Sequence, residues 1–332
     1  MSSVSVLKII IWIVVIAATV IMLGTVYIYS AGLKKLFYPI KDLKIIPQIE
    51  FKDLLLPHQT PTKFQLRTKE HSSDKNPKND YISAWHFSDF NSKNKIKKTI
   101  LFCHGSSGNI SHREYIINFC KGYEINLLLF DYRGYGASSS NNSPKMILQD
   151  GLLAYDYLAS VTESKDIIVW GESLGGAVAG YIASKRQVGK LLLLSTFSSL
   201  SDIVAYDKKN NILFRSAARM IPNVMNELST KNLNISCPTL VAHSRDDEII
   251  PYECAIILFN SIKNDQKVFV EIAGKHAIPI LIESDIRQML EFCEIGNDNQ
   301  RTEHAKRFIS DLKQAALNIN NSATEKNVDV KV

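Results

Sequence analysis

The stretch Asp166-Ile-Ile-Val-Trp-Gly-Glu-Ser-Leu-Gly-Gly176 joins a short apolar run to the pattern Gly-x-Ser-x-Gly. The apolar run predicts a strand, and the small residues of Ala177–Ser184 predict a helix directly after it. A tight strand-to-helix turn leaves room only for small residues beside the serine, so the turn itself demands Gly171 and Gly175. Ser173 would then be exposed at the carboxyl end of the strand as a candidate nucleophile. The alternative is an ordinary turn that happens to contain a serine.

Two later apolar runs also end in polar residues. Pro238–Ala242 is followed by His-Ser-Arg-Asp-Asp-Glu-Ile-Ile-Pro, and Lys267–Ile272 is followed by Ala-Gly-Lys-His. Both runs predict strands of the sheet that carries Ser173, so both can bring a side chain to the same edge. A serine needs a neighbouring base, and the base needs a third group that fixes its tautomer. Of the eight histidines, His276 is the best candidate base because the others lie in polar, tail or structural positions.

With these motifs the chain resembles the α/β-hydrolase superfamily from about residue 51 to residue 292. The resemblance implies a catalytic triad in the chain order serine, acid, histidine. The family pattern His-Gly-x-x-Asp-x-x-Ile/Val falls on the segment after Ala242 and places the acid at Asp247. Asp246, one position earlier, is the competing candidate. The same resemblance gives His276 the role of base and His243 a structural role before the acid loop.

A third strand end matches the same family. The run Leu101-Phe-Cys-His-Gly105 opens a motif of the form His-Gly-x-x-Gly-Asn-Ile-Ser-His-Arg that ends at Arg113. The resemblance makes this segment the loop that binds the oxyanion. Two backbone N–H groups are needed there. We expect them to be the amides of Leu174 and Ser106, with Ser107 as the less favoured donor.

Composition excludes other classes of function. The net charge of +6 is modest and spread through the loops, with no basic stripe interleaved with aromatic residues, so nucleic acid is not an expected partner. The five cysteines form no Cys-x-x-Cys pair, so no metal site is indicated. The resemblance implies no cofactor.

The N-terminal segment predicts a membrane anchor. Ile9–Tyr29 is an uncharged apolar run of about 21 residues, enough to cross a bilayer. A secretory signal peptide is the alternative, but its apolar core is shorter and Ile28–Ala31 is a poor cleavage site. Four lysines follow the run within residues 34–44 and one precedes it, which slightly favours a cytoplasmic catalytic domain. Membrane-anchored relatives are often assigned the opposite orientation, so the side is left open.

The rest of the chain divides into segments. We expect an anchor over residues 1–35, a juxtamembrane connector over 36–61, an α/β-hydrolase domain over 62–296 with a cap insertion over 196–236, and a polar, partly disordered tail over 297–332. Within the domain, strands alternate with helical patterns, which predicts a mostly parallel sheet covered by helices on both faces. One short helix is expected in the tail over 302–317.

The chain therefore looks like a membrane-anchored, ABHD-type serine hydrolase, a group often placed with serine aminopeptidases. The resemblance implies that the Ser173, His276 and Asp247 triad cleaves acyl esters or thioesters, with a lipid ester or an S-acylated protein as substrate and the lipid bilayer as a partner. A peptidase or amidase is the alternative reaction. A non-catalytic scaffold that retains the fold is the alternative outside enzymes.

Overall fold

The structure is a computed structural model of the 332-residue chain. It describes residues 12, 38–39, 41–42, 47, 49–58, 65–66, 80–88, 90, 98–139, 142–207, 212, 215–216, 227–231, 233–276, 278–280, 282–296 and 298–324.

A nine-stranded sheet organises this part of the chain, in the order β11-β10-β9-β8-β5-β7-β4-β2-β3. The six strands from β11 to β7 are parallel, whereas β2 and β4 join the edge in antiparallel pairings. Their bounds are β2 Lys52–Pro57, β3 Gln65–Leu66, β4 Tyr81–Phe87, β5 Thr99–Cys103, β7 Asn126–Phe130, β8 Ile167–Glu172, β9 Lys190–Leu194, β10 Thr239–Ser244 and β11 Lys267–Ile272.

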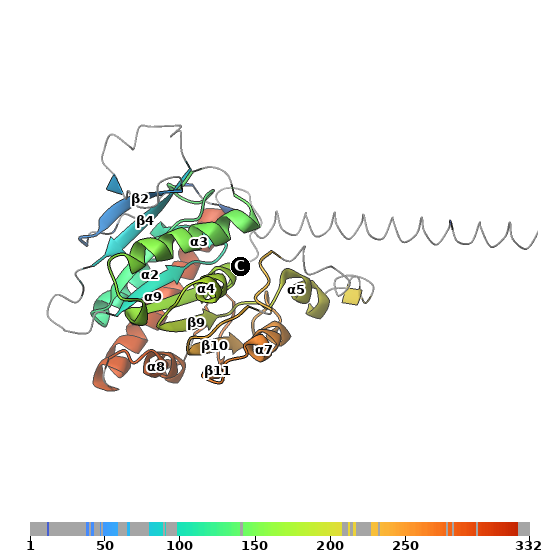
Figure 1. The fold of residues 1–332 in the computed structure, drawn as a ribbon. Coiled ribbons are helices and arrows are strands. Elements are labelled where there is room, and N and C mark those ends of the chain that lie inside the picture. Colours follow the sequence, from blue (N-terminus) through green and yellow to red (C-terminus); the bar gives the residue numbers. More distant parts are fainter. Residues whose placement is uncertain are drawn as a thin grey trace, which may run out of the picture.

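Helices cover both faces of the sheet (Figure 1). On one face lie α3 Pro144–Ala159, α4 Leu174–Lys185, α5 Leu200–Tyr206 and α7 Tyr252–Ser261; on the other lie α2 Glu114–Gly122, α8 Glu283–Phe292 and α9 Asp298–Thr324. The central strands are apolar throughout because alternate residues enter the two cores. In β5, for example, Leu101 and Cys103 pack on the first face, and Ile100 and Phe102 on the second. The predicted α/β-hydrolase fold is confirmed.

The predicted domain boundary at residue 62 needs correction. Residues 52–57, assigned to a connector over 36–61, form β2 and pair with β4 along its length. Leu54, Leu55 and Leu56 are buried, which is why this short apolar run belongs to the sheet. Further upstream, β1 Tyr38–Pro39 pairs in parallel with β6 Ser107–Gly108. The connector therefore contributes to the folded domain.

The segment 297–332 also differs from the prediction of a polar, partly disordered tail. Residues 298–324 form the single helix α9, longer than the helix expected over 302–317. Its apolar residues recur every three or four positions and face α2 and α8, so the helix has one buried stripe despite its polar composition. The stripe consists of Ala305, Phe308, Ile309, Leu312 and Ala315. Residues 325–332 lie outside the described residues.

One other prediction falls almost wholly, and another partly, outside the described residues. Of the predicted anchor Ile9–Tyr29, only Trp12 is described. Within the described part of the chain, no helix combines the length and the apolar character needed to cross a bilayer. Of the predicted cap over 196–236, the structure describes α5 and the segments around it, where the buried Thr230 hydroxyl donates to the carbonyls of Phe197 and Ser198.

Candidate active site

Ser173 occupies the turn between β8 and α4. Its backbone has φ 54° and ψ −120°, a conformation that costs free energy for a residue with a side chain. The neighbouring glycines make this turn possible. A Cβ atom at Gly171 would lie 2.4 Å from the Gly175 carbonyl oxygen, and a Cβ atom at Gly175 would lie 1.9 Å from the Cys103 carbonyl oxygen. The turn thus forces the serine side chain out at the end of the strand.

The three predicted triad residues form one hydrogen-bonded chain. The Ser173 hydroxyl oxygen lies 3.0 Å from His276 Nε2, and His276 Nδ1 lies 2.8 Å from Asp247 Oδ2. The other carboxylate oxygen of Asp247 accepts hydrogen bonds from the amides of Ile249 and Ile250, at 3.0 and 2.8 Å. The competing residue Asp246 is exposed and is not the carboxylate that contacts His276. The geometry therefore pairs the histidine with Asp247.

The buried groups around Asp247 favour its ionised form. Burial alone would raise the pKa of Asp247, but the hydrogen bond from His276, the charges of His276 and His243, and the Ile250 amide together lower the pKa below its ordinary value. His243 lies beside Asp247, with its Nε2 3.0 Å from the carbonyl oxygen of Ile250. Burial lowers the pKa of His243, although the charge of Asp247 opposes the shift. Through its contact with the Ile250 carbonyl, His243 supports the acid loop from within the core.

The predicted oxyanion loop lies directly against the serine. A Cβ atom at Gly105 would lie 3.4 Å from Ser173 Cβ, and Ser106 lines the same pocket as Ser173. Leu174 is the first residue of α4, where a helix leaves its amide without an intrahelical acceptor. The loop is held by His104, whose Nδ1 donates to the Gly105 carbonyl at 2.7 Å. Of the two predicted donors, Leu174 therefore directly follows the serine in the chain, and Ser106 lines the same pocket.

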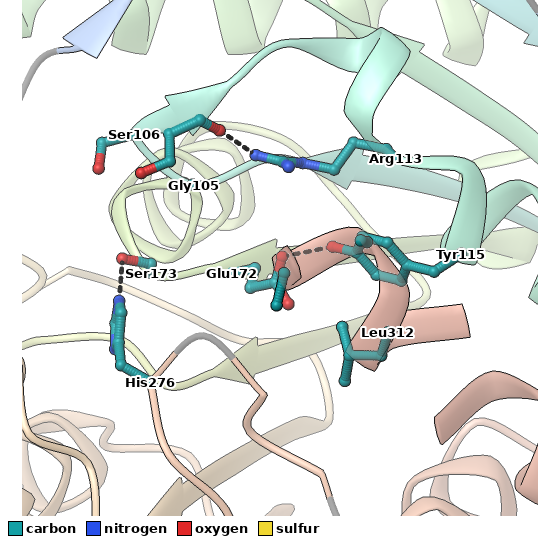
Figure 2. Close-up of a pocket in the computed structure, with 11 residues that line it drawn as sticks. Gly105, Ser106, Arg113, Tyr115, Glu172, Ser173, His276 and Leu312 are labelled. Carbon is teal, nitrogen blue, oxygen red and sulfur yellow. Dashed lines mark hydrogen bonds between the residues drawn. The ribbon is translucent and has the colours of Figure 1, made fainter. Parts of the chain in front are cut away.

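Figure 2 shows the pocket in front of Ser173 and several residues that the sequence did not single out for the site. Glu172 accepts a hydrogen bond of 2.6 Å from the Tyr115 hydroxyl, and burial together with Glu172 raises the pKa of Tyr115 well above its ordinary value. Arg113, the last residue of the oxyanion-loop motif, also lines the pocket. The remaining wall is an apolar stretch in the middle of α9, made of Leu312, Ala315 and Ala316.

The five cysteines are free and buried, and burial raises the pKa of Cys237 to about 11. Among the residues that the structure describes, no three His, Cys, Asp or Glu side chains gather as a metal site would require.

Comparison with known proteins identifies the family. A model of the family described as "Serine aminopeptidase, S33" matches residues 94–224. Protein bem46 of Schizosaccharomyces pombe is 27% identical over 261 residues, which cover 76% of this chain and 82% of that protein. The uncharacterized protein R595 of Acanthamoeba polyphaga mimivirus is 32% identical over 203 residues, covering 55% of this chain and 68% of R595.

Another relative carries an assigned activity. Lysophosphatidylserine lipase ABHD12 of Danio rerio is 26% identical over 198 residues, which cover 54% of this chain and 50% of that protein. Among solved structures, the Pyrococcus furiosus esterase Pf2001 matches with a TM-score of 0.52 at 19% identity, covering 84% of this chain and 97% of the esterase. The chain belongs to the α/β-hydrolase superfamily, among its ABHD-type members. This membership supports hydrolase activity.

Proposed function

We propose that the protein is a serine hydrolase that cleaves acyl esters or thioesters. The observation that carries the proposal is the hydrogen-bonded chain from Ser173 through His276 to Asp247, with distances of 3.0 and 2.8 Å. In this mechanism His276 Nε2 takes the hydroxyl proton as Ser173 Oγ attacks the acyl carbonyl carbon. The amides of Ser106 and Leu174 stabilise the oxyanion that forms.

The second half of the mechanism returns the enzyme to its starting state. The histidine gives its proton to the departing alcohol or thiol, which leaves the acyl group on Ser173 as an ester. Water then attacks this ester, His276 takes the water proton, and the carboxylic acid departs as the proton returns to the serine oxygen. Asp247 keeps the imidazole in one orientation and stabilises its charged form throughout.

We propose a lipid ester or an S-acylated protein as the substrate. One relative is by its name a lysophosphatidylserine lipase, which makes a lipid ester a chemically reasonable choice here. The apolar wall of α9, formed by Leu312, Ala315 and Ala316, suits an apolar acyl chain better than a polar substrate group.

A membrane anchor over Ile9–Tyr29 is part of the same proposal, since it would keep the active site near lipid substrates. An alkaline carbonate wash should leave the full-length chain in the membrane pellet. Recovery of a soluble chain with a new N-terminus near Ala31 would identify the segment as a signal peptide instead. The flanking lysines slightly favour a cytoplasmic catalytic domain, and protease protection in sealed vesicles tests that orientation.

The alternative reaction is that of a peptidase or amidase, which the description of the matching family model favours. The decisive experiment offers one acyl group as an oxygen ester, a thioester and an amide, beside an aminoacyl anilide. We expect the ester and thioester to be cleaved much faster than either amide by the wild type, and none by Ser173→Ala. Preference for the anilide would favour the peptidase, and no Ser173-dependent turnover would favour a non-catalytic scaffold.

A further inference from the structure

Arg113 carries a buried charge that forms no ion pair with any carboxylate in the described part of the chain. Its side chain follows the 3₁₀ turn Ile110–His112, and the residue is only 3% exposed. One terminal nitrogen, Nη2, donates to the Ser107 carbonyl, but Nε has no hydrogen-bond partner. Within the described part of the chain, no carboxylate forms an ion pair with this guanidinium. Buried charges are ordinarily paired, because an isolated charge is costly to remove from water.

The unpaired guanidinium faces the same pocket as the serine. Arg113, Ser106 and Ser107 line this pocket together with Ser173 and His276. Figure 2 shows the Arg113 side chain reaching toward the oxyanion loop, beside the space in front of Ser173. An anion placed there would meet a fixed, planar donor of hydrogen bonds, flanked by two serine residues.

We infer that Arg113 forms an anion subsite, and that the substrate is an ester that carries a phosphate or carboxylate group close to the scissile bond. This inference rests on the proposed ester hydrolysis. The anion would complete the ion pair that Arg113 lacks and would hold the ester carbonyl in one orientation before Ser173. Arg113 would thereby select among esters, while the triad performs the same chemistry on each of them.

Glu172 carries a charge of the opposite sign to Arg113, so the inference makes a second prediction at this residue. Its carboxylate lines the same pocket, where it accepts the hydrogen bond from Tyr115. Like charges repel most strongly where water is partly excluded. Removing the charge of Glu172 should therefore favour an anionic substrate, whereas removing the charge of Arg113 should disfavour it.

The test compares esters that share one acyl chain. The alcohol is glycerol in the neutral ester, glycerol phosphate in the second and a hydroxycarboxylic acid in the third. We measure the ratio of kcat/KM for each anionic ester to that for the neutral ester. Arg113→Gln should lower this ratio by about 10- to 100-fold, the range expected for a charged hydrogen bond. Arg113→Lys should retain much of the ratio, and Glu172→Gln should raise it.

The matched control is Arg186→Gln, which removes the same charge from a partly exposed arginine already paired with Asp156. It should leave the ratio unchanged. Whichever anionic ester shows the larger effect of Arg113→Gln identifies phosphate or carboxylate as the bound group. If Arg113→Gln does not fold, Arg113→Lys and inhibition of neutral-ester hydrolysis by inorganic phosphate carry the test.

An unchanged ratio in folded Arg113→Gln, with equal losses on all esters, would show that Arg113 only supports the oxyanion loop. If the variant does not fold, failure of inorganic phosphate to inhibit neutral-ester hydrolysis by the wild type and by Arg113→Lys would likewise overturn the inference. In either case Ser173-dependent cleavage of the neutral ester would still uphold the proposed function. No Ser173-dependent cleavage of any ester would remove the proposed function and the inference together.

Discussion

The two sides of the pocket are built on different physical principles. On one side, Ser173, Asp247 and His276 follow the ends of three strands, and a strained turn fixes the serine between glycines. On the other side, α9 presents Leu312, Ala315 and Ala316 from a long helix that packs against α2 and α8. The first side depends on backbone geometry, whereas the second depends on the size of a few apolar side chains.

This difference separates the residues that carry out the reaction from those that determine which substrates fit. A misplacement of a strand-end residue by about 1 Å can cost about 100-fold in rate, so the catalytic side tolerates little change. A helix wall of small residues can change size without altering those hydrogen bonds. We therefore expect substitutions on the strand ends to affect every substrate, and substitutions on α9 to change which substrates fit.

Apart from removal of the nucleophile itself, the largest expected effect on the strand-end side is at the acid. Asp247→Asn should leave the fold intact and lower kcat by about 10⁴-fold, as in the comparable change in chymotrypsin-type proteases. Asp246→Asn is the matched control and should cost little, because Asp246 is exposed and does not contact His276. Steady-state kinetics on a soluble ester measures both. Reversed roles for the two variants would show that the acid has been assigned one position off.

The strained turn should be the least tolerant part of the backbone. Gly175→Ala places a Cβ atom 1.9 Å from a carbonyl oxygen of β5, so we expect a loss of several kcal/mol of stability or no folded protein. Gly180→Ala lies further along α4, where the nearest atoms would be 3.4 and 3.5 Å away. It should be tolerated, with a gain of about 0.5–1 kcal/mol from the helix. Thermal melting of both variants gives the comparison, and equal stabilities would contradict it.

Substitutions on the α9 side should change which esters are preferred and should leave the catalytic step intact. Ala316→Phe fills the pocket, so kcat/KM for a long acyl ester should fall by about 10-fold relative to a short one. Leu317→Phe changes the next residue, which is 56% exposed, and should leave the ratio unchanged. A series of p-nitrophenyl esters of rising chain length measures the effect. Equal losses on short and long esters would mean that α9 supports the catalytic side and does not select substrates.

The smallest effect concerns the pH dependence of stability. Burial lowers the pKa of His243 below 6.5. As the pH falls, the unfolded chain therefore binds a proton at this histidine at a higher pH than the folded protein does. Stability from this residue is complete above about pH 6.5 and declines as the pH falls toward the lowered pKa, by at most about 1.4 kcal/mol per pH unit. In His243→Gln the melting temperature should depend less on pH between pH 7 and pH 5. An unchanged slope in this variant would assign the pH dependence to other groups.

The sequence predicts those parts of the molecule whose geometry demands particular residues. Gly171 and Gly175 are required by the turn, and apolar runs predict the strands that lead to the other two polar segments. Within those segments, the resemblance to the α/β-hydrolases was needed to place the acid at Asp247 and to give His276 the role of base. The structure then brings all three polar residues within hydrogen-bonding distance.

Other parts could not be predicted because their signals are weak or depend on packing. The strand β2 is a run of three leucines that ends at Pro57, too short to distinguish from a connector. The stripe of α9 includes two alanines among many polar residues, so composition suggested a tail. Glu172 occupies a variable position of the Gly-x-Ser-x-Gly pattern, and nothing local indicates that its side chain reaches Tyr115.

The most direct test of the account is to identify the residue that reacts with a fluorophosphonate. After labelling of the full-length protein, peptide mass spectrometry should find one adduct on Ser173. Ser173→Ala should show no adduct and a turnover reduced by about 10⁴- to 10⁶-fold, the range known for nucleophile removal in serine proteases. An adduct on another residue, or equal labelling of Ser173→Ala, would contradict the assignment of Ser173 as the nucleophile.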